Sequence, residues 1–251
     1  MMNGFNDKVA LVTGAGSGIG EAIAADLAAG GAKVLVADLD LAAAHRVTGD
    51  IVRAGGSAAA VQVDVADAAS VERMVASAVS EFGALHLAVN NAGIGGPSVP
   101  TAEYPLDGWH KVVDVNLNGV FYCMKFEIAA MLASGGGAIV NMSSILGSVG
   151  WANASAYVAC KHALVGLTKA AALEYAVSNI RVNAVGPAFI DTPLLSKNLD
   201  EATMAGLAGL HPANRLGTPK EVSALTCFLL SDDASFVNGS YHLVDGGYTS
   251  R

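Results

Sequence analysis

The sequence predicts an α/β fold in which helices cover both faces of a parallel sheet of about seven strands. Short β-branched runs alternate with longer Ala-rich helical patterns along the whole chain, and this alternation is typical of right-handed crossovers between parallel strands. The strands also read as almost continuous apolar runs, such as VALVT and KVLVAD, as expected where both faces of a sheet are covered. No linker-like stretch or repeat divides the 251 residues, so we expect a single domain over 1–251.

The expected elements follow one another at regular intervals. β-Branched runs place the strands at 9–13, 33–38, 59–64, 87–90, 138–143, 181–185 and 241–244. Amphipathic patterns place the helices near 18–29, 41–54, 67–82, 103–133, 156–178 and 219–231. The proline-rich stretch 186–218 breaks this rhythm and carries a short Leu, Met and Ala segment. Because long excursions of this kind are usually functional, we expect 190–212 to form a substrate lid.

Composition and charge exclude several classes of protein. With 53% apolar residues, 14% charged residues and a mean hydropathy of +0.46, the chain can bury a large core and is not expected to be disordered. Its net charge of -8 and the lack of a basic run argue against nucleic acid or an anionic membrane as partner. No apolar run approaches the length of a membrane span, and residues 1–8 do not resemble a leader, so we expect a cytoplasmic protein.

The cysteine and histidine patterns do not predict a metal site. Cys123, Cys160 and Cys227 are widely spaced, without a CxxC motif, and we expect them to be reduced and buried. No HExxH or paired-His motif is present.

The first strand leads directly into a glycine-rich turn, TGAGSGIG at 13–20. Glycines at such a turn let backbone N–H groups approach a diphosphate at the N-terminus of the following helix. The strict GxGxxG spacing is not met, since Ile19 occupies the sixth position, and taken alone the turn could be an ordinary strand-to-helix connection. Asp38, at the end of the second strand, could accept hydrogen bonds from ribose hydroxyls or be a solvated loop residue. Together they favour a dinucleotide site in a doubly wound, Rossmann-type sheet.

A tyrosine and a lysine one helical turn apart suggest proton transfer. A tyrosine hydroxyl titrates near 10, so it is a poor base at neutral pH unless a neighbouring charge stabilises the phenolate. Tyr157 and Lys161 are spaced i and i+4, which puts them on one face of a helix. The lysine ammonium is expected to lower the pKa of the tyrosine. The alternative is an ordinary pair on the helix surface.

Several motifs occur together along the chain. These are TGxxxGxG at 13–20, Asp64-Val65, Asn90-Asn91-Ala92-Gly93, Asn116, Ser144 and Tyr157-xxx-Lys161. In order and spacing they resemble the short-chain dehydrogenase/reductase family, and the resemblance extends over almost the whole chain.

The resemblance implies a catalytic set. Tyr157 would exchange the proton, Ser144 would position the substrate oxygen, and Lys161 would tune Tyr157 and hold the ribose of the nicotinamide. Asn116 would support a water-linked proton relay to Lys161. The 13-residue spacing to Tyr157 selects Ser144 over the adjacent Ser143.

The resemblance also implies a cofactor site. Its expected residues are Gly14, Ser17, Gly18, Ile19, Gly20, Asp38, Leu39, Asp64, Val65, Asn91, Ala92, Gly93, Tyr157, Lys161, Pro187, Ile190 and Thr192. Asn91 is expected to be more structural than catalytic. The chain has Ala188 where the family usually has glycine, which puts the backbone shape there in question. The carboxylate of Asp38, followed by Leu39 rather than a basic residue, favours NAD over NADP.

These features predict an NAD-dependent dehydrogenase that interconverts a secondary alcohol and a ketone. The resemblance implies a substrate pocket that contains Ile145, Trp151, Asn153 and Phe189, and these side chains favour a neutral cyclic or aryl substrate. One alternative is an NADP-dependent 3-oxoacyl carrier-protein reductase, and another is a noncatalytic dinucleotide-sensing module. The helical stretches 103–133 and 156–178 carry apolar residues on more than one face, and the C-terminal stretch 237–248 is apolar and glycine-rich. The family resemblance implies that these elements pair in a homotetramer.

Overall fold

The structure is a computed structural model that describes residues 4–196 and 200–250. Within these residues, one parallel sheet contains seven strands in the order β3-β2-β1-β4-β5-β6-β7. The strands are β1 (Val9–Thr13), β2 (Lys33–Asp38), β3 (Ser57–Gln62), β4 (Leu87–Asn90), β5 (Gly137–Met142), β6 (Ile180–Pro187) and β7 (Tyr241–Val244). This confirms the predicted doubly wound, Rossmann-type α/β fold.

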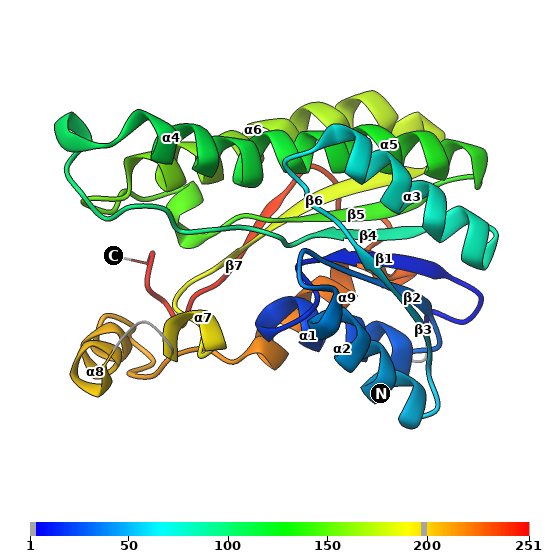
Figure 1. Ribbon diagram of the computed structural model, residues 1–251, viewed down its shortest axis with the longest axis horizontal. Coiled ribbons are helices and arrows are strands. Elements are labelled where there is room, and N and C mark those ends of the chain that lie inside the picture. Colours follow the sequence, from blue (N-terminus) through cyan, green and yellow to red (C-terminus); the bar gives the residue numbers. More distant parts are fainter. Residues whose placement is uncertain (1–3, 197–199, 251) are drawn as a thin grey trace.

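Helices cover both faces of the sheet (Figure 1). One face carries α1 (Gly18–Ala29), α2 (Leu41–Arg53) and α9 (Pro219–Leu230). The other face carries α3 (Ala68–Phe82), α5 (Gly119–Ala133) and α6 (Ser155–Tyr175), with α4 (Leu106–Val113) leading into α5. The short helices α7 (Pro193–Ser196) and α8 (Glu201–Gly209) lie beyond the sheet, on the side where the C-terminus ends.

Side chains alternate along each strand, so each strand contributes to the hydrophobic cores on both faces of the sheet. In β1, Val12 packs with the helices α1 and α9, whereas Leu11 packs with α3, α5 and α6, and both side chains are fully buried. Successive residues of a strand point to opposite faces, so an unbroken apolar run is what this position between two helical layers requires.

Residues 103–133 are not the single helix that the sequence predicts. α4 begins only after Pro105, which lacks a backbone N–H and restricts the residue before it to extended conformations. Between α4 and α5 the chain forms a π-helical turn over Asp114–Asn118. Such a turn inserts one residue into the helical repeat, and an apolar periodicity does not reveal it.

The predicted boundaries shift by a few residues elsewhere. β3 covers Ser57–Gln62 rather than 59–64, because its pairing with β2 ends at Asp38 and Gln62. The backbone N–H of Asp64 donates instead to the Oγ of Ser70 (3.2 Å).

The excursion after β6 contains α7 and α8, in place of one segment at 199–210. Part of the predicted lid, 197–199, lies outside the described residues. The role of 190–212 as a lid stays a prediction.

A buried polar network connects four elements beneath the ends of β4 and β5. The Nδ2 of Asn90 donates to the Oε2 of Glu127 (3.1 Å) and to the Oδ1 of Asn141 (3.0 Å), and the Nδ2 of Asn141 donates to the Oγ1 of Thr168 (3.0 Å). Glu127 is completely buried, and burial raises the pKa of its carboxyl to about 8. Glu127 is therefore a neutral acid at pH 7.

The described parts of the chain show neither a membrane-spanning helix nor a cluster of metal-binding side chains. Over 4–196 and 200–250, none of the helices is both long and apolar enough to cross a membrane. The same ranges contain no group of three or more His, Cys, Asp or Glu side chains that could hold a metal ion. Cys123, Cys160 and Cys227 are buried and free, as expected.

Candidate active site

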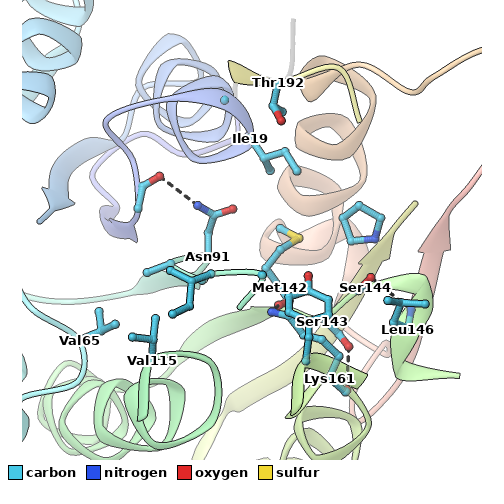
Figure 2. Close-up of a pocket in the computed structure, with 18 of the residues that line it drawn as sticks. Ile19, Val65, Asn91, Val115, Met142, Ser143, Ser144, Leu146, Lys161 and Thr192 are labelled. Carbon is cyan, nitrogen blue, oxygen red and sulfur yellow. Dashed lines mark hydrogen bonds between the residues drawn. The ribbon is translucent and has the colours of Figure 1, made fainter. Parts of the chain in front are cut away.

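A cleft of about 1210 Å³ opens at the edge of the sheet where the parallel strands end. The strand order reverses there, between β1 and β4, which is where open α/β sheets bind their ligands. Figure 2 shows its walls: Ile19 and Thr192 lie on one side, Val65 and Val115 on a second, and Ser144 and Lys161 on a third.

The glycine-rich turn needs its glycines for two different reasons. Gly14 and Gly18 adopt positive φ angles of 61° and 58°, which favour glycine. At Gly20 a Cβ would lie 2.3 Å from the carbonyl oxygen of Gly14, so this glycine allows close packing. Gly14, Ser17, Gly18 and Ile19 line the cleft, and Gly20 is not among the lining residues. The first N–H groups of α1 have no partner within the helix, so the turn can hold a phosphate.

Asn91 clamps this turn to the end of β4. Its Nδ2 donates to the carbonyl oxygens of Thr13 (3.0 Å) and Gly14 (3.1 Å), and one of these bonds is drawn in Figure 2. The Oγ1 of Thr13 in turn accepts from the backbone N–H groups of Asn91 (3.0 Å) and Ala92 (3.1 Å). The side chain of Asn91 is thus used for structure, and Asn91, Ala92 and Gly93 all line the cleft.

Asp38 and Leu39 line the cleft beyond the glycine-rich turn. The Oδ2 of Asp38 accepts from the backbone N–H of Gly16 (2.8 Å), and its Oδ1 accepts from the N–H of Asp40 (3.0 Å). A Cβ at Gly16 would lie 2.8 Å from the same Oδ2, so a side chain there would displace the carboxylate. The turn and the carboxylate therefore form one structural unit that can hold a diphosphate and a ribose.

The nearest guanidinium to this unit belongs to Arg46. It donates to the carbonyl oxygen of Gly16 (2.9 Å) and forms ion pairs with Glu21 (2.7 Å) and Asp50 (3.3 Å). Its positive charge is therefore already compensated by two carboxylates.

The wall of the cleft that contains Val65 and Val115 is apolar. Val65 is buried, and Val115 from the π-helical turn faces the cleft beside it. Asp64 lines the cleft as predicted, and its Oδ1 accepts from the N–H of Ala66 (2.9 Å). Sequence analysis missed Val115, although its position next to Asn116 could have indicated it.

The structure separates the two adjacent serines. The Oγ of Ser143 donates to the carbonyl oxygen of Lys161 (2.9 Å), which joins β5 to α6. The Oγ of Ser144 accepts from the N–H of Leu146 (3.2 Å) and is hydrogen-bonded to the hydroxyl of Tyr157. The hydroxyl of Tyr241 donates a hydrogen bond to the carbonyl oxygen of Ser144. Of the two serines, Ser144 is thus the one that is hydrogen-bonded to Tyr157.

Tyr157 and Lys161 lie on one face of α6, as their spacing predicts. The Nζ of Lys161 lies 5.3 Å from the centroid of the Tyr157 ring and donates to the carbonyl oxygen of Met142 (2.8 Å). Lys161 is 3% exposed, so its ammonium is held within the protein rather than in solvent.

Burial governs the titration of both groups. It raises the pKa of Tyr157 to about 12, although the hydrogen bond with Ser144 acts in the opposite direction. It lowers the pKa of Lys161 to about 8. The pKa of Tyr157 is thus raised, because loss of solvent is the largest effect, and the lowering contribution expected of Lys161 stays a prediction.

Asn116 is fully buried in the π-helical turn and is not among the residues lining the cleft. Its Nδ2 donates to the carbonyl oxygens of Ile94 (2.9 Å) and Val112 (2.9 Å), and its Oδ1 accepts from the N–H of Ile94 (3.2 Å). No hydrogen bond between the described Asn116 and Lys161 side chains is present. Its side chain shapes the loop after β4.

The end of β6 and the loop after it close the remaining side of the cleft. Pro187, Ile190 and Thr192 line it as expected. Ala188 lines it too, without a positive φ angle, and its N–H donates to the carbonyl oxygen of Val244 (3.1 Å). Alanine in place of the usual glycine is thus compatible with this backbone.

The structure brings only part of the predicted substrate pocket together. Ile145 and Phe189 line the cleft, whereas Trp151 and Asn153 do not. Trp151 instead packs edge-on against Phe189, with ring centroids 5.5 Å apart, and Asn153 adopts a positive φ of 65° in the loop before α6. Sequence analysis missed the polar side chains that α4 and the π-helical turn add to the lining, namely Asp107, His110, Lys111 and Asp114.

Comparisons with known proteins agree with this geometry. A family model described as enoyl-(acyl carrier protein) reductase matches residues 14–249. The chain is 55% identical over 251 residues to cyclohexanol dehydrogenase of Acinetobacter sp. (strain SE19), which covers 100% of this chain and 98% of that protein. It is 46% identical over 250 residues to cis-4-hydroxycyclohexanecarboxylate dehydrogenase of Sinomonas cyclohexanicum, with complete coverage of both.

Solved structures show the same relationship. The crystal structure of levodione reductase superimposes with a TM-score of 0.95 at 36% identity, covering 98% of this chain and 99% of that one. The matches span nearly the whole chain, including the glycine-rich turn and the Ser144, Tyr157 and Lys161 set. The chain belongs to the short-chain dehydrogenase/reductase family.

Proposed function

We propose that this protein is an NAD-dependent dehydrogenase that interconverts a neutral cyclic or aryl secondary alcohol and its ketone. The observation that carries the proposal is the meeting of two sets of residues in one cleft. The phosphate-binding turn and Asp38 lie at one end, and Ser144, Tyr157 and Lys161 lie at the other. The named activities of the relatives on cyclohexane rings support a ring-shaped substrate.

Each residue at the catalytic end has a separate role in alcohol oxidation. Ser144 holds the substrate hydroxyl beside Tyr157, and Tyr157 accepts its proton. Lys161, held by the carbonyl of Met142, stabilises the phenolate and anchors the ribose. Asn116 fixes the loop at Ile94 and supports a water-linked proton relay to Lys161. Bound NAD would supply the acceptor for the hydride.

The two alternative functions have less support. A 3-oxoacyl carrier-protein reductase that uses NADP would need a free cation near Asp38 and a basic face for its acidic carrier. Arg46 is already paired with carboxylates, and the net charge is -8. A noncatalytic sensing module would have no need of the Ser144 and Tyr157 hydrogen bond.

The substrate class can be tested with a panel of alcohols followed by NADH absorbance. We expect kcat/KM for cyclohexanol or 1-phenylethanol to exceed that for a sugar alcohol by at least about tenfold, because the apolar side chains of Ile145 and Phe189, which line the cleft, offer no hydrogen bonds to additional hydroxyl groups. A 3-hydroxyacyl thioester with NADP serves as the competing substrate. A preference for the thioester or for the sugar alcohol would contradict the proposal.

We also propose a homotetramer. Large apolar side chains are exposed on α5, α6 and β7, namely Phe121, Leu132, Leu173 and Leu243. Exposed apolar side chains on neighbouring elements are typical of subunit interfaces. Light scattering is expected to give about four times the chain mass of 25.3 kDa, and a mass of one or two chains would contradict the tetramer.

A cytoplasmic location is part of the same proposal. The three cysteines are buried and unpaired, which supports a reducing compartment.

A further inference from the structure

Four rings from separate parts of the chain meet at the substrate end of the cleft. Phe189 lies at their centre, with ring centroids 5.5 Å from Trp151, 5.8 Å from His211 and 6.0 Å from Tyr248. His211 and Tyr248 also contact each other, at 5.6 Å. The angles between Phe189 and its three neighbours are 65°, 89° and 67°, the edge-to-face arrangements that aromatic pairs prefer. Of the four, only Phe189 lines the cleft, and the other three contact its ring without lining the cleft themselves.

The C-terminal tail is folded to deliver Tyr248 to this cluster. The carboxylate of Asp245 accepts from the backbone N–H groups of Gly247 (3.0 Å) and Thr249 (2.9 Å) and from the Oγ1 of Thr249 (2.6 Å). The tail also packs on the end of the predicted lid, where the N–H of Ala213 donates to the carbonyl oxygen of Gly246 (3.1 Å). The position of Tyr248 is therefore set by a hydrogen-bonded turn.

His211 connects the same cluster to α8. Its side chain is 3% exposed, and its Nδ1 donates to the carbonyl oxygen of Leu207 (2.9 Å) in the last turns of that helix. The imidazole is thus fixed at its Nδ1 and packed on two rings. Phe189 is braced by the loop after β5, by the end of α8 and by the C-terminal tail at once.

We infer that Tyr248 and His211 are specificity-determining residues that brace Phe189 as a rigid flat wall selecting ring-shaped over open-chain secondary alcohols. The inference rests on the proposed function and deepens it. A six-membered ring can lie against a fixed aromatic face without losing conformational entropy. An open chain must fix several rotatable bonds to bury the same area, which costs entropy. If the brace is removed, Phe189 can turn aside and the open chain no longer faces this disadvantage.

The test compares two neutral secondary alcohols with the same number of carbons, cyclohexanol and 2-hexanol, at saturating NAD. Tyr248→Ala is expected to lower the ratio of their kcat/KM values by about five- to tenfold. Tyr248→Phe keeps the ring and is expected to retain the wild-type ratio. Phe236→Ala is the matched control, because Phe236 is fully exposed and away from the cluster. The affinity for NADH, measured by fluorescence titration, is expected to stay unchanged and reports correct folding.

A second variant guards against misfolding of the first. Trp151→Ala removes a ring that is 40% exposed and is expected to change the ratio in the same direction. If the wild-type enzyme oxidises cyclohexanol but both alanine variants keep its ratio within twofold, the inference is overturned and the proposed function stands. If the wild type oxidises neither alcohol, the proposed function fails and the inference fails with it.

Discussion

Replacing Tyr157 by Phe is expected to lower kcat for alcohol oxidation by about 10²- to 10⁴-fold, which is the usual contribution of a positioned acid or base. The phenyl ring keeps its place on α6, so the cofactor end of the cleft is unchanged and the affinity for NADH should stay near the wild-type value. Steady-state kinetics and a fluorescence titration with NADH measure the two quantities separately.

The matched control is Tyr175→Phe, which removes a hydroxyl from the other end of the same helix. It is expected to leave kcat unchanged. Retention of more than about a tenth of the wild-type kcat by the Tyr157→Phe enzyme would exclude Tyr157 as the proton acceptor. Because burial raises the pKa of Tyr157, its phenolate form becomes more populated as the pH rises, and oxidation by the wild type should become faster in that direction.

The second large effect concerns the choice of cofactor. The 2'-phosphate of NADP would lie close to the carboxylate of Asp38, and two unit charges about 4 Å apart repel by about 4 kcal/mol at an effective dielectric of about 20. Salt screening in a partly open site reduces this to about 2 to 3 kcal/mol, which still corresponds to a preference for NAD of about 30- to 150-fold. The ratio of kcat/KM values with NAD and NADP measures it directly.

The double change Asp38→Ala with Leu39→Arg is expected to shift this ratio strongly toward NADP. It removes the repelling carboxylate and adds a guanidinium at a residue that is 64% exposed and lines the cleft. Glu72→Ala, on the outside of α3, removes the same charge without touching the cleft. Equal use of the two cofactors by the wild type would show that Asp38 does not select between them.

Local signals predicted most of the fold. The strand Val9–Thr13 and the glycine-rich turn after it are predicted correctly, because strand, turn and helix each favour particular residue types at neighbouring positions. The sequence pattern did not predict the break at Pro105 or the π-helical turn that contains Asn116. Both depend on where a backbone hydrogen bond is lost or shifted, which the apolar periodicity does not record.

The sequence predicted most of the residues that line the cleft but not the direction of the pKa shift of Tyr157. The spacing to Tyr157 selects Ser144 over Ser143, and in the structure Ser144 is the serine that is hydrogen-bonded to Tyr157. The raised pKa of Tyr157 is a consequence of depth, which spacing along a helix does not encode. The family resemblance assigned Trp151 to the pocket, whereas in the structure it does not line the cleft and contacts the ring of Phe189.

Glu127 links the stability of the fold to acidity. The folded chain keeps this proton up to a pH of about 8, but the unfolded chain releases it at the ordinary pKa of 4.5. Below pH 4.5 both states carry the proton, and between these values only the folded state does, so the contribution of Glu127 to stability falls steadily as the pH rises. Alcohol oxidation releases a proton, and alkaline solutions therefore favour the ketone. An alkaline pH that favours alcohol oxidation therefore also lowers the free energy of unfolding, through the buried carboxyl of Glu127.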